Sequence, residues 1–142
     1  EEVREKRGLA YSAYSYLAPL DHAGIIIGGA GTANARTGET VKVLRDEWAK
    51  MNKSGLTQTE LKDAKTYLTG SYPLRFSSSR RIAGMMTGIQ LEKLGLSYIK
   101  KRNSYIEAVS LDDVNRVAAK LLDPAKITMV IVGQPKGVTS TP

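Results

Sequence analysis

The chain has 142 residues, of which 42% are hydrophobic and 25% are charged, a composition that fits one globular domain and excludes wholesale disorder. Lysine and arginine outnumber aspartate and glutamate by 21 to 14, and the resulting charge of +7 suits an acidic partner or aids solubility. Cysteine is absent and His22 is the single histidine, which excludes disulfides and any zinc site that needs two histidines from this chain. No apolar run approaches the roughly 20 residues that a membrane span needs.

The chain opens with a predicted β-hairpin. Residues 9–17 alternate loosely, which predicts a strand with Leu9 and Tyr11 on the same face. Residues 24–30 predict a second strand, and residues 18–21, which include a proline, predict the turn between them. We therefore expect an antiparallel pair.

Five helices are predicted next. The first carries an apolar face with helical spacing, made of Val41, Leu44, Trp48 and Met51. Capping boxes at residues 57–60 and 110–113 predict where the second and fifth helices begin, and serines at 77–79 and 97 predict the starts of the third and fourth. We expect the fifth helix to bury Val114, Val117, Ala118 and Leu121.

A closing strand at residues 127–132 completes the predicted order of strand, strand, five helices and strand. This order indicates an α+β fold, an antiparallel-rich sheet with helices packed on one face. Three strands form a thin sheet for five helices, and residues 1–7 have the pattern of a helix end, so we expect the chain to be the back part of a longer protein. We assign residues 1–135 to one incomplete domain and residues 136–142 to a flexible tail.

Several features have a possible chemical use and a simpler explanation. Residues 28–31 are glycine-rich after a strand, but no phosphate-binding motif is present, and a flexible strand end is the better account. Basic residues between 75 and 102 could meet nucleic acid, yet they are spread over two predicted helices and fit a solvated face. His22 lies beside Asp21 with no nucleophile placed near it, which favours a surface histidine.

Arg4 and Tyr11 are the strongest candidates for chemistry. A tight turn at Gly8 brings a cation and a phenol to one end of the sheet. Arginine can grip the carbonyls of an extended peptide, and a tyrosine hydroxyl can donate to a developing oxyanion. The simpler interpretation is a surface arginine and a core tyrosine.

The segment Arg-Glu-Lys-Arg-Gly-Leu-Ala-Tyr-Ser, residues 4–12, resembles the signature in the C-terminal half of the pitrilysin–insulinase zinc metallopeptidases, the inverse zincins. The similarity continues through residues 56–65, which resemble a late helix of that family. Residues 110–124 and 127–133 resemble its final helix and strand. The resemblance thus covers almost the whole chain up to Pro135, and its specific part is the Arg-to-Tyr spacing.

The resemblance implies paired homologous α+β domains that enclose a chamber, one of them carrying zinc on a His-x-x-Glu-His helix. Tyr11 would then be catalytic and bind the scissile carbonyl or the tetrahedral intermediate, while Arg4 would hold a neighbouring substrate carbonyl. This chain has no His-x-x-Glu-His, so it resembles the zinc-less domain and an incomplete copy of it. No metal is expected in the chain, and zinc is expected in a homologous partner domain or subunit.

Two functions follow from the resemblance. The first is a component that completes the active site of a zinc peptidase and binds an extended peptide, without activity as an isolated chain. The alternative is a non-catalytic structural or assembly subunit of the same family, and retention of both Arg4 and Tyr11 favours the first. We expect no nucleic acid, no membrane span, a possible homo-oligomer of the fragment, and the bacterial periplasm rather than the cytoplasm.

Overall fold

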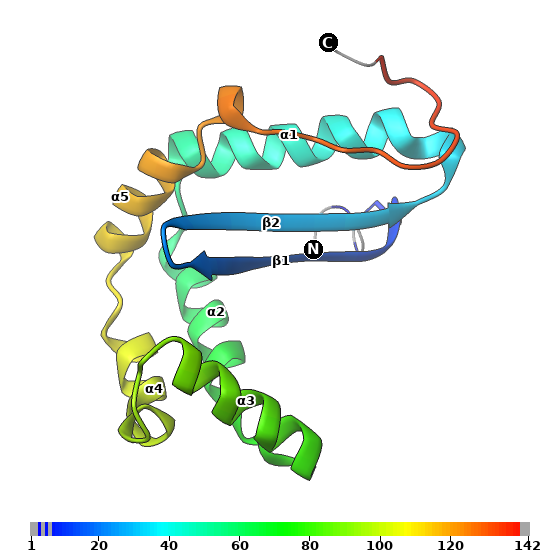
Figure 1. Cartoon of the computed structure of the whole chain (residues 1–142). Helices are drawn as coiled ribbons and strands as arrows, with labels where there is room; N and C mark the ends of the chain where they lie inside the picture. Colours follow the sequence, from blue (N-terminus) through cyan, green and yellow to red (C-terminus); the bar gives the residue numbers. More distant parts are fainter. Residues whose placement is uncertain (1–2, 4, 6, 140–142) are drawn as a thin grey trace. The chain divides into compact units, whose positions relative to one another are not determined.

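The computed structural model describes residues 3, 5 and 7–139 of the chain (Figure 1). Arg4 and most of the predicted helix end at residues 1–7 lie outside the described residues. In chain order the elements are β1 (Ala10–Leu20), β2 (Ala23–Thr32), η2 (Asn34–Arg36), α1 (Thr37–Ser54), α2 (Gln58–Gly70), η3 (Tyr72–Phe76), α3 (Ser79–Leu91), α4 (Ser97–Ala108), α5 (Leu111–Leu121) and η4 (Pro124–Lys126). The predicted α+β class is confirmed.

The chain divides into two compact units, one formed by residues 1–53 and 122–142 and the other by residues 54–121. The first unit contains the antiparallel hairpin of β1 and β2, together with α1 (Figure 1). Its small core consists of Val3, Leu9, Ala10 and Val43, so the base of the hairpin packs against the start of α1. The strands are longer than predicted, because their pairing continues through Pro19 to a two-residue turn.

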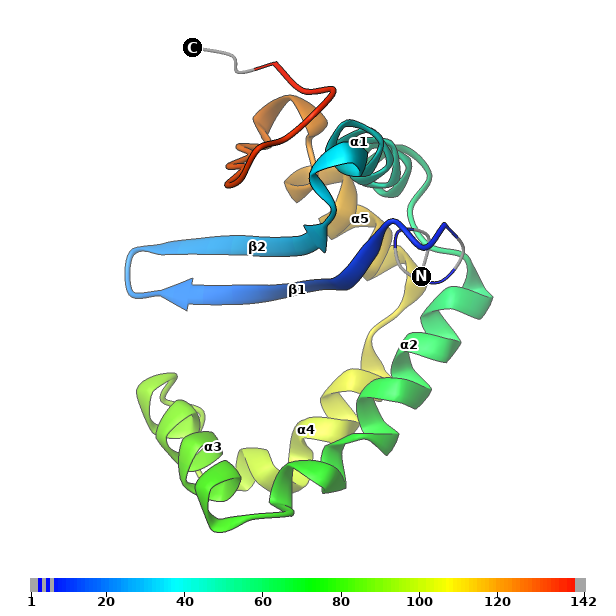
Figure 2. The same ribbon diagram turned by 90° about the vertical axis from the view of Figure 1, so that its right-hand side faces the viewer.

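The second unit consists of α2 to α5, and the starts of α2, α3 and α5 agree with the caps predicted from sequence. Helix α4 begins at Ser97 as predicted, but without a side-chain cap. Thr57 accepts a hydrogen bond from the backbone amide of Glu60, whose carboxylate accepts one from the Thr57 amide, as a capping box requires. Ser78 caps α3 through the amide of Arg81. Helices α2 and α4 run side by side, as Figure 2 shows.

The box at the start of α5 joins Ser110 and Asp113. The Ser110 hydroxyl donates to Asp113 Oδ2 at 2.6 Å and accepts from the Asp113 amide at 3.1 Å. The bonds from Ser110, followed by one from Arg116, lower the pKa of the Asp113 carboxyl, because they favour its charged form.

Two details of the predicted packing are wrong. Residues 127–132 form no strand, because no strand within residues 3, 5 and 7–139 pairs with them, and Val130 and Val132 are almost fully exposed. Leu121 is 53% exposed at the end of α5, where only Ala118 is buried. On α1 the four residues of the predicted apolar face are half-buried and Leu44 packs against the core, while Thr37, Thr40 and Val43 are buried.

Segment 133–137 is fastened to the start of α1 within the first unit. The Lys136 amide donates to the Asn34 carbonyl at 2.9 Å, and the Gly38 amide donates to the Lys136 carbonyl at 3.0 Å. A side chain at position 38 would overlap the Gly137 backbone, so glycine allows this close approach. Lys136 and Gly137, where the sequence predicts the tail to begin, are therefore attached to the fold.

Candidate functional site

Tyr11 occupies a β-bulge at the beginning of the hairpin. Ala10 pairs with Thr32 and Ser12 pairs with Gly31, so β1 advances by two residues while β2 advances by one. The extra residue is Tyr11. A bulge changes the direction of the side chain that it carries and is frequent beside active sites.

Because of the bulge, the prediction that Leu9 and Tyr11 lie on the same face of the strand is wrong. Leu9 is 2% exposed and Ala10 is 6% exposed, whereas Tyr11 is 90% exposed. Leu9 and Tyr11 therefore do not share a face, because the inserted residue breaks the strict alternation of a strand. Tyr11 is not a core tyrosine, and its hydroxyl makes no hydrogen bond within the described part of the chain.

The turn before Tyr11 is as tight as the sequence predicts. Gly8 has a φ of 55°, and the Leu9 amide donates to the Val3 carbonyl at 2.8 Å. The left-handed conformation at Gly8 is strained for residues with a Cβ, which explains a glycine here. Arg4, the other predicted member of the site, lies outside the described residues.

Sequence analysis missed the residues that hold this turn. Arg36 donates to the Gly8 carbonyl at 2.9 Å and to the Arg7 carbonyl at 3.3 Å. Thr32 donates to the Leu9 carbonyl at 2.6 Å. These contacts join residues more than 20 positions apart, and no local motif signals them.

The other sequence candidates have structural roles. The glycines at 28–31 lie inside β2 rather than at a strand end, and a Cβ on Gly29 would collide with the ring of Tyr14 across the hairpin. Arg81 donates to the Leu74 carbonyl and the Ser77 hydroxyl. Arg102 donates to the Leu68 carbonyl and lies 4.5 Å from the centre of the Tyr72 ring. These two guanidinium groups are engaged within the second unit.

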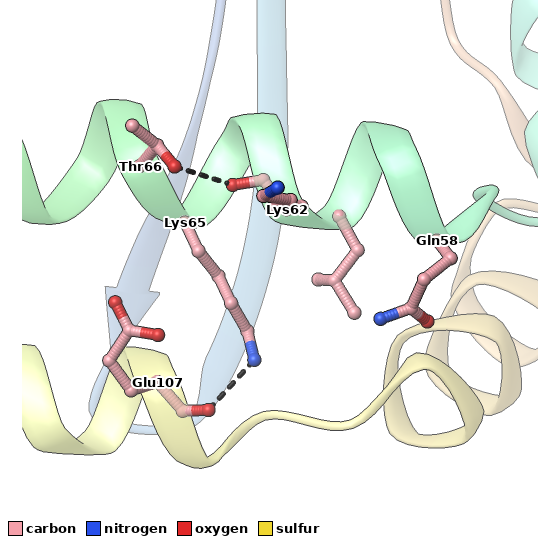
Figure 3. Close-up of a pocket in the computed structure, with 6 residues that line it drawn as sticks. Gln58, Lys62, Lys65, Thr66 and Glu107 are labelled. Atoms are coloured by element: carbon pink, nitrogen blue, oxygen red, sulfur yellow. Dashed lines mark hydrogen bonds between the residues drawn. The ribbon is translucent and has the colours of Figure 1, made fainter.

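A shallow pocket of about 350 Å³ lies on the second unit beside α2 (Figure 3). Lys65 crosses it and donates from Nζ to the Glu107 carbonyl at 2.7 Å, at the end of α4. The pocket is lined by Gln58, Leu61, Lys62, Lys65, Thr66 and Glu107. Lys65 thereby satisfies a carbonyl in the last turn of a helix, which is a structural task.

The described residues do not fit a zinc site. No group of three or more histidine, aspartate or glutamate side chains gathers in that part of the chain, and the whole sequence has one histidine and no cysteine. None of the helices of residues 3, 5 and 7–139 is both long and apolar enough to cross a bilayer. The periplasmic location stays a prediction.

Residues 1–68 match the family model described as the peptidase M16 inactive domain. The chain is 33% identical over 125 residues to an uncharacterized zinc protease of Streptomyces coelicolor, covering 86% of this chain and 27% of that protein. It is 29% identical over 124 residues to the uncharacterized zinc protease YmxG of Bacillus subtilis, covering 85% of this chain and 30% of that one. The chain thus spans less than a third of the length of these relatives.

Solved structures agree with these sequence matches. The crystal structure of a peptidase M16 inactive domain from Pseudomonas fluorescens aligns with a TM-score of 0.71 and 33% identity, covering 88% of this chain and 30% of that one. A protease from Helicobacter pylori shares the fold with a TM-score of 0.64 and 22% identity, over 84% of this chain and 29% of that one. The chain belongs to the peptidase M16 or pitrilysin family and carries part of its C-terminal inactive domain.

Proposed function

We propose that this chain supplies the substrate-binding and oxyanion-stabilising side of a zinc peptidase active site. The observation that carries the proposal is the β-bulge at Tyr11, which leaves a phenol 90% exposed directly after the tight Gly8 turn. An exposed tyrosine in an irregular strand position contributes little packing, so a structural role explains it poorly.

Tyr11 would donate its hydroxyl proton in a hydrogen bond to the oxygen of the scissile carbonyl. That oxygen gains negative charge as the tetrahedral intermediate forms, so the bond strengthens in the transition state. Arg4 would donate to a neighbouring backbone carbonyl of an extended peptide and fix its register, using the two parallel donors of its guanidinium. Hydrolytic metal chemistry would come from zinc in the partner, because this chain offers no ligand set for it.

The proposed partner is a homologous zinc-bearing domain or subunit, and the proposed substrate is a peptide in extended form. Relatives named zinc proteases are more than three times as long as the segment matched here, which leaves room for such a domain in those proteins. We propose residues 1–135 as the contribution of this chain to the inactive domain. A non-catalytic assembly subunit is the competing function, and kinetics separate the two.

The test compares Tyr11→Phe with Tyr14→Phe in the enzyme completed by its zinc-bearing domain, using an internally quenched peptide. Tyr14 is the matched control because it is also exposed on β1 and also loses only a hydroxyl. We expect Tyr11→Phe to lower kcat by about 10²–10³-fold, as loss of other oxyanion donors does, and Tyr14→Phe to leave it unchanged. Equal kcat for Tyr11→Phe and the parent would favour the assembly subunit.

Arg4 is tested by Arg4→Ala and Arg4→Lys in the same complete enzyme. Because Arg4 would hold the peptide before reaction, Arg4→Ala should raise KM as well as lower kcat. Lysine keeps the charge but lacks the planar pair of donors, so it should restore only part of the loss. An unchanged KM for Arg4→Ala would remove Arg4 from the peptide-binding site.

A further inference from the structure

Three consecutive carbonyls in the turn before Tyr11 all accept hydrogen bonds from side chains. The Arg7 and Gly8 carbonyls bind the two terminal nitrogens of Arg36, and the Leu9 carbonyl binds the Thr32 hydroxyl. A turn is usually held by its own backbone bonds. Here the backbone bond from the Leu9 amide to the Val3 carbonyl is joined by the three bonds from distant side chains.

The donors are themselves held in place. Thr40 is 2% exposed in the first turns of α1, and its hydroxyl oxygen lies 3.0 Å from that of Thr32 and 3.0 Å from the Arg36 carbonyl. Thr32 donates to the Leu9 carbonyl and Thr40 donates to the Arg36 carbonyl, which uses both hydroxyl protons. The two hydroxyl oxygens therefore lie in contact, and a hydrogen bond between them forms only when one of the two carbonyls loses its donor. The turn and the start of α1 therefore form one connected polar unit.

The guanidinium of Arg36 is partly exposed to solvent. The Arg36 side chain is 43% exposed, and it also meets Glu39 at 3.4 Å. Its two terminal nitrogens point to adjacent carbonyls of the backbone, an arrangement that the planar fork of arginine suits and a single ammonium does not. Hydrogen bonds from a charged donor are about twice as strong as neutral ones.

The position of the Tyr11 phenol depends on its backbone, which lies between the paired residues Ala10 and Ser12 and directly after the fastened turn. Its side chain is 90% exposed and has no hydrogen-bond partner in the described residues, so the backbone alone decides where the phenol lies. Arg4 precedes the fastened carbonyls by three residues, and Tyr11 follows them by two. Movement of the turn would therefore move the Tyr11 phenol.

We infer that Arg36 is a positioning residue that sets the geometry of Tyr11 by clamping the Arg7–Gly8 turn. This inference rests on the function proposed above. It adds a residue 25 positions beyond Tyr11 that touches neither substrate nor reacting atoms. A displacement of about 1 Å at a reacting group can cost on the order of 10²-fold in rate, so loss of the clamp should be visible in catalysis.

The first measurement is amide hydrogen exchange at Leu9 in the full chain. Arg36→Met keeps the length and apolar stem of the side chain but removes its donors, and we expect the Leu9 amide to exchange about tenfold faster. Arg36→Lys should give a smaller increase. Arg45→Met is the matched control, because Arg45 is an exposed arginine on α1 that makes no hydrogen bond or ion pair within the described residues. Unchanged exchange at Leu9 in Arg36→Met would overturn the inference whatever the catalytic results.

The second measurement is a double-mutant cycle in the complete enzyme with the quenched peptide. If Arg36 acts through Tyr11, Arg36→Met should lower kcat on the order of tenfold in the parent but much less in the Tyr11→Phe background. The same loss in both backgrounds would overturn the inference. If Tyr11→Phe itself leaves kcat unchanged, the proposed function fails and the positioning role in catalysis falls with it, while the exchange result still reports whether the clamp exists.

Discussion

Two glycine turns in this protein have the same backbone conformation but are built differently. Gly8 has a φ of 55° and Gly55 has a φ of 64°. A Cβ on Gly8 would meet no atom within 4 Å, whereas a Cβ on Gly55 would collide with the side chain of Asn115. Gly8 is required for its dihedral angle alone, and Gly55 is required for its dihedral angle and for the space that it leaves.

The partners of the two turns differ as well. Asn115 of α5 closes on Leu56 in both directions, accepting from its amide at 2.8 Å and donating to its carbonyl at 3.5 Å. The Gly8 turn is held from outside by Arg36, whose side chain is partly in solvent. One turn is a packed joint within the helical unit, and the other is an open turn held by a polar clamp.

The largest effect should come from Gly55→Ala. The left-handed backbone costs about 1–2 kcal/mol for a residue with a Cβ, and overlap with Asn115 adds on the order of 1–3 kcal/mol. We expect a loss of about 2–5 kcal/mol in the free energy of unfolding, measured with urea. In the background of Asn115→Ala the overlap disappears. The further loss of unfolding free energy caused by Gly55→Ala should then fall toward the cost of the left-handed backbone alone. If the double variant lost the full sum of the two single losses in the free energy of unfolding, the predicted overlap between position 55 and Asn115 would be contradicted.

Asn115→Ala by itself should have the next largest effect. It leaves the amide and the carbonyl of Leu56 without their partner in a partly buried place. An unmade bond of this kind costs about 1–3 kcal/mol. The loss should appear in urea unfolding. Asn115→Asp, which keeps the acceptor oxygen but not the donor, should lose less, because the shorter bond is the one that it retains.

Gly8→Ala should cost only the dihedral strain of about 1–2 kcal/mol, because the space around Gly8 is open. Gly8→Asn should cost less than Gly8→Ala, since asparagine tolerates the left-handed region better than other residues. Thermal unfolding of the two variants provides the comparison. A loss for Gly8→Ala as large as that for Gly55→Ala would mean that the Gly8 turn is packed.

The smallest effect concerns the pH dependence of the α5 cap. The folded pKa of Asp113 is lowered, so the carboxylate contributes stability above the ordinary pKa of an aspartate and loses it as the pH falls through the folded value. Asp113→Asn should therefore differ from the parent more at about pH 7 than at about pH 3. Urea midpoints of both proteins at the two pH values test this. If the midpoints of Asp113→Asn and the parent differed equally at both pH values, the charge of Asp113 would not contribute to the stability of the α5 cap.

The predicted closing strand at residues 127–132 could not be tested by its sequence pattern alone. Residues 127–132 are apolar enough for a buried strand, yet Val130 is 85% exposed and the segment pairs with nothing in the described part of the chain. A strand exists only where a second backbone lies beside it, and periodicity cannot supply that neighbour. Leu121 is a similar case, because it lies in α5 as predicted but is exposed rather than buried.

The candidate site was partly predictable. The spacing of Arg4, Gly8 and Tyr11 is visible in the sequence, and the tight turn at Gly8 is present in the structure. The bulge was not predictable, because it depends on how β1 and β2 pair and on the one-residue mismatch between Ala10 and Ser12. The role of Arg36 was equally hidden, since its contacts reach back 28 and 29 residues.

The sequence by itself determined the helix starts, the hairpin and the glycine turn, because caps, alternation and left-handed glycines act between residues that are close in the chain. It also carried the family signature at residues 4–12. The tertiary structure decided that Tyr11 is bulged and exposed, that Arg36 and Thr32 hold its turn, and that residues 127–132 stay outside the sheet. Each of these depends on which distant backbone or side chain lies near enough to bond, and folding alone brings those groups together.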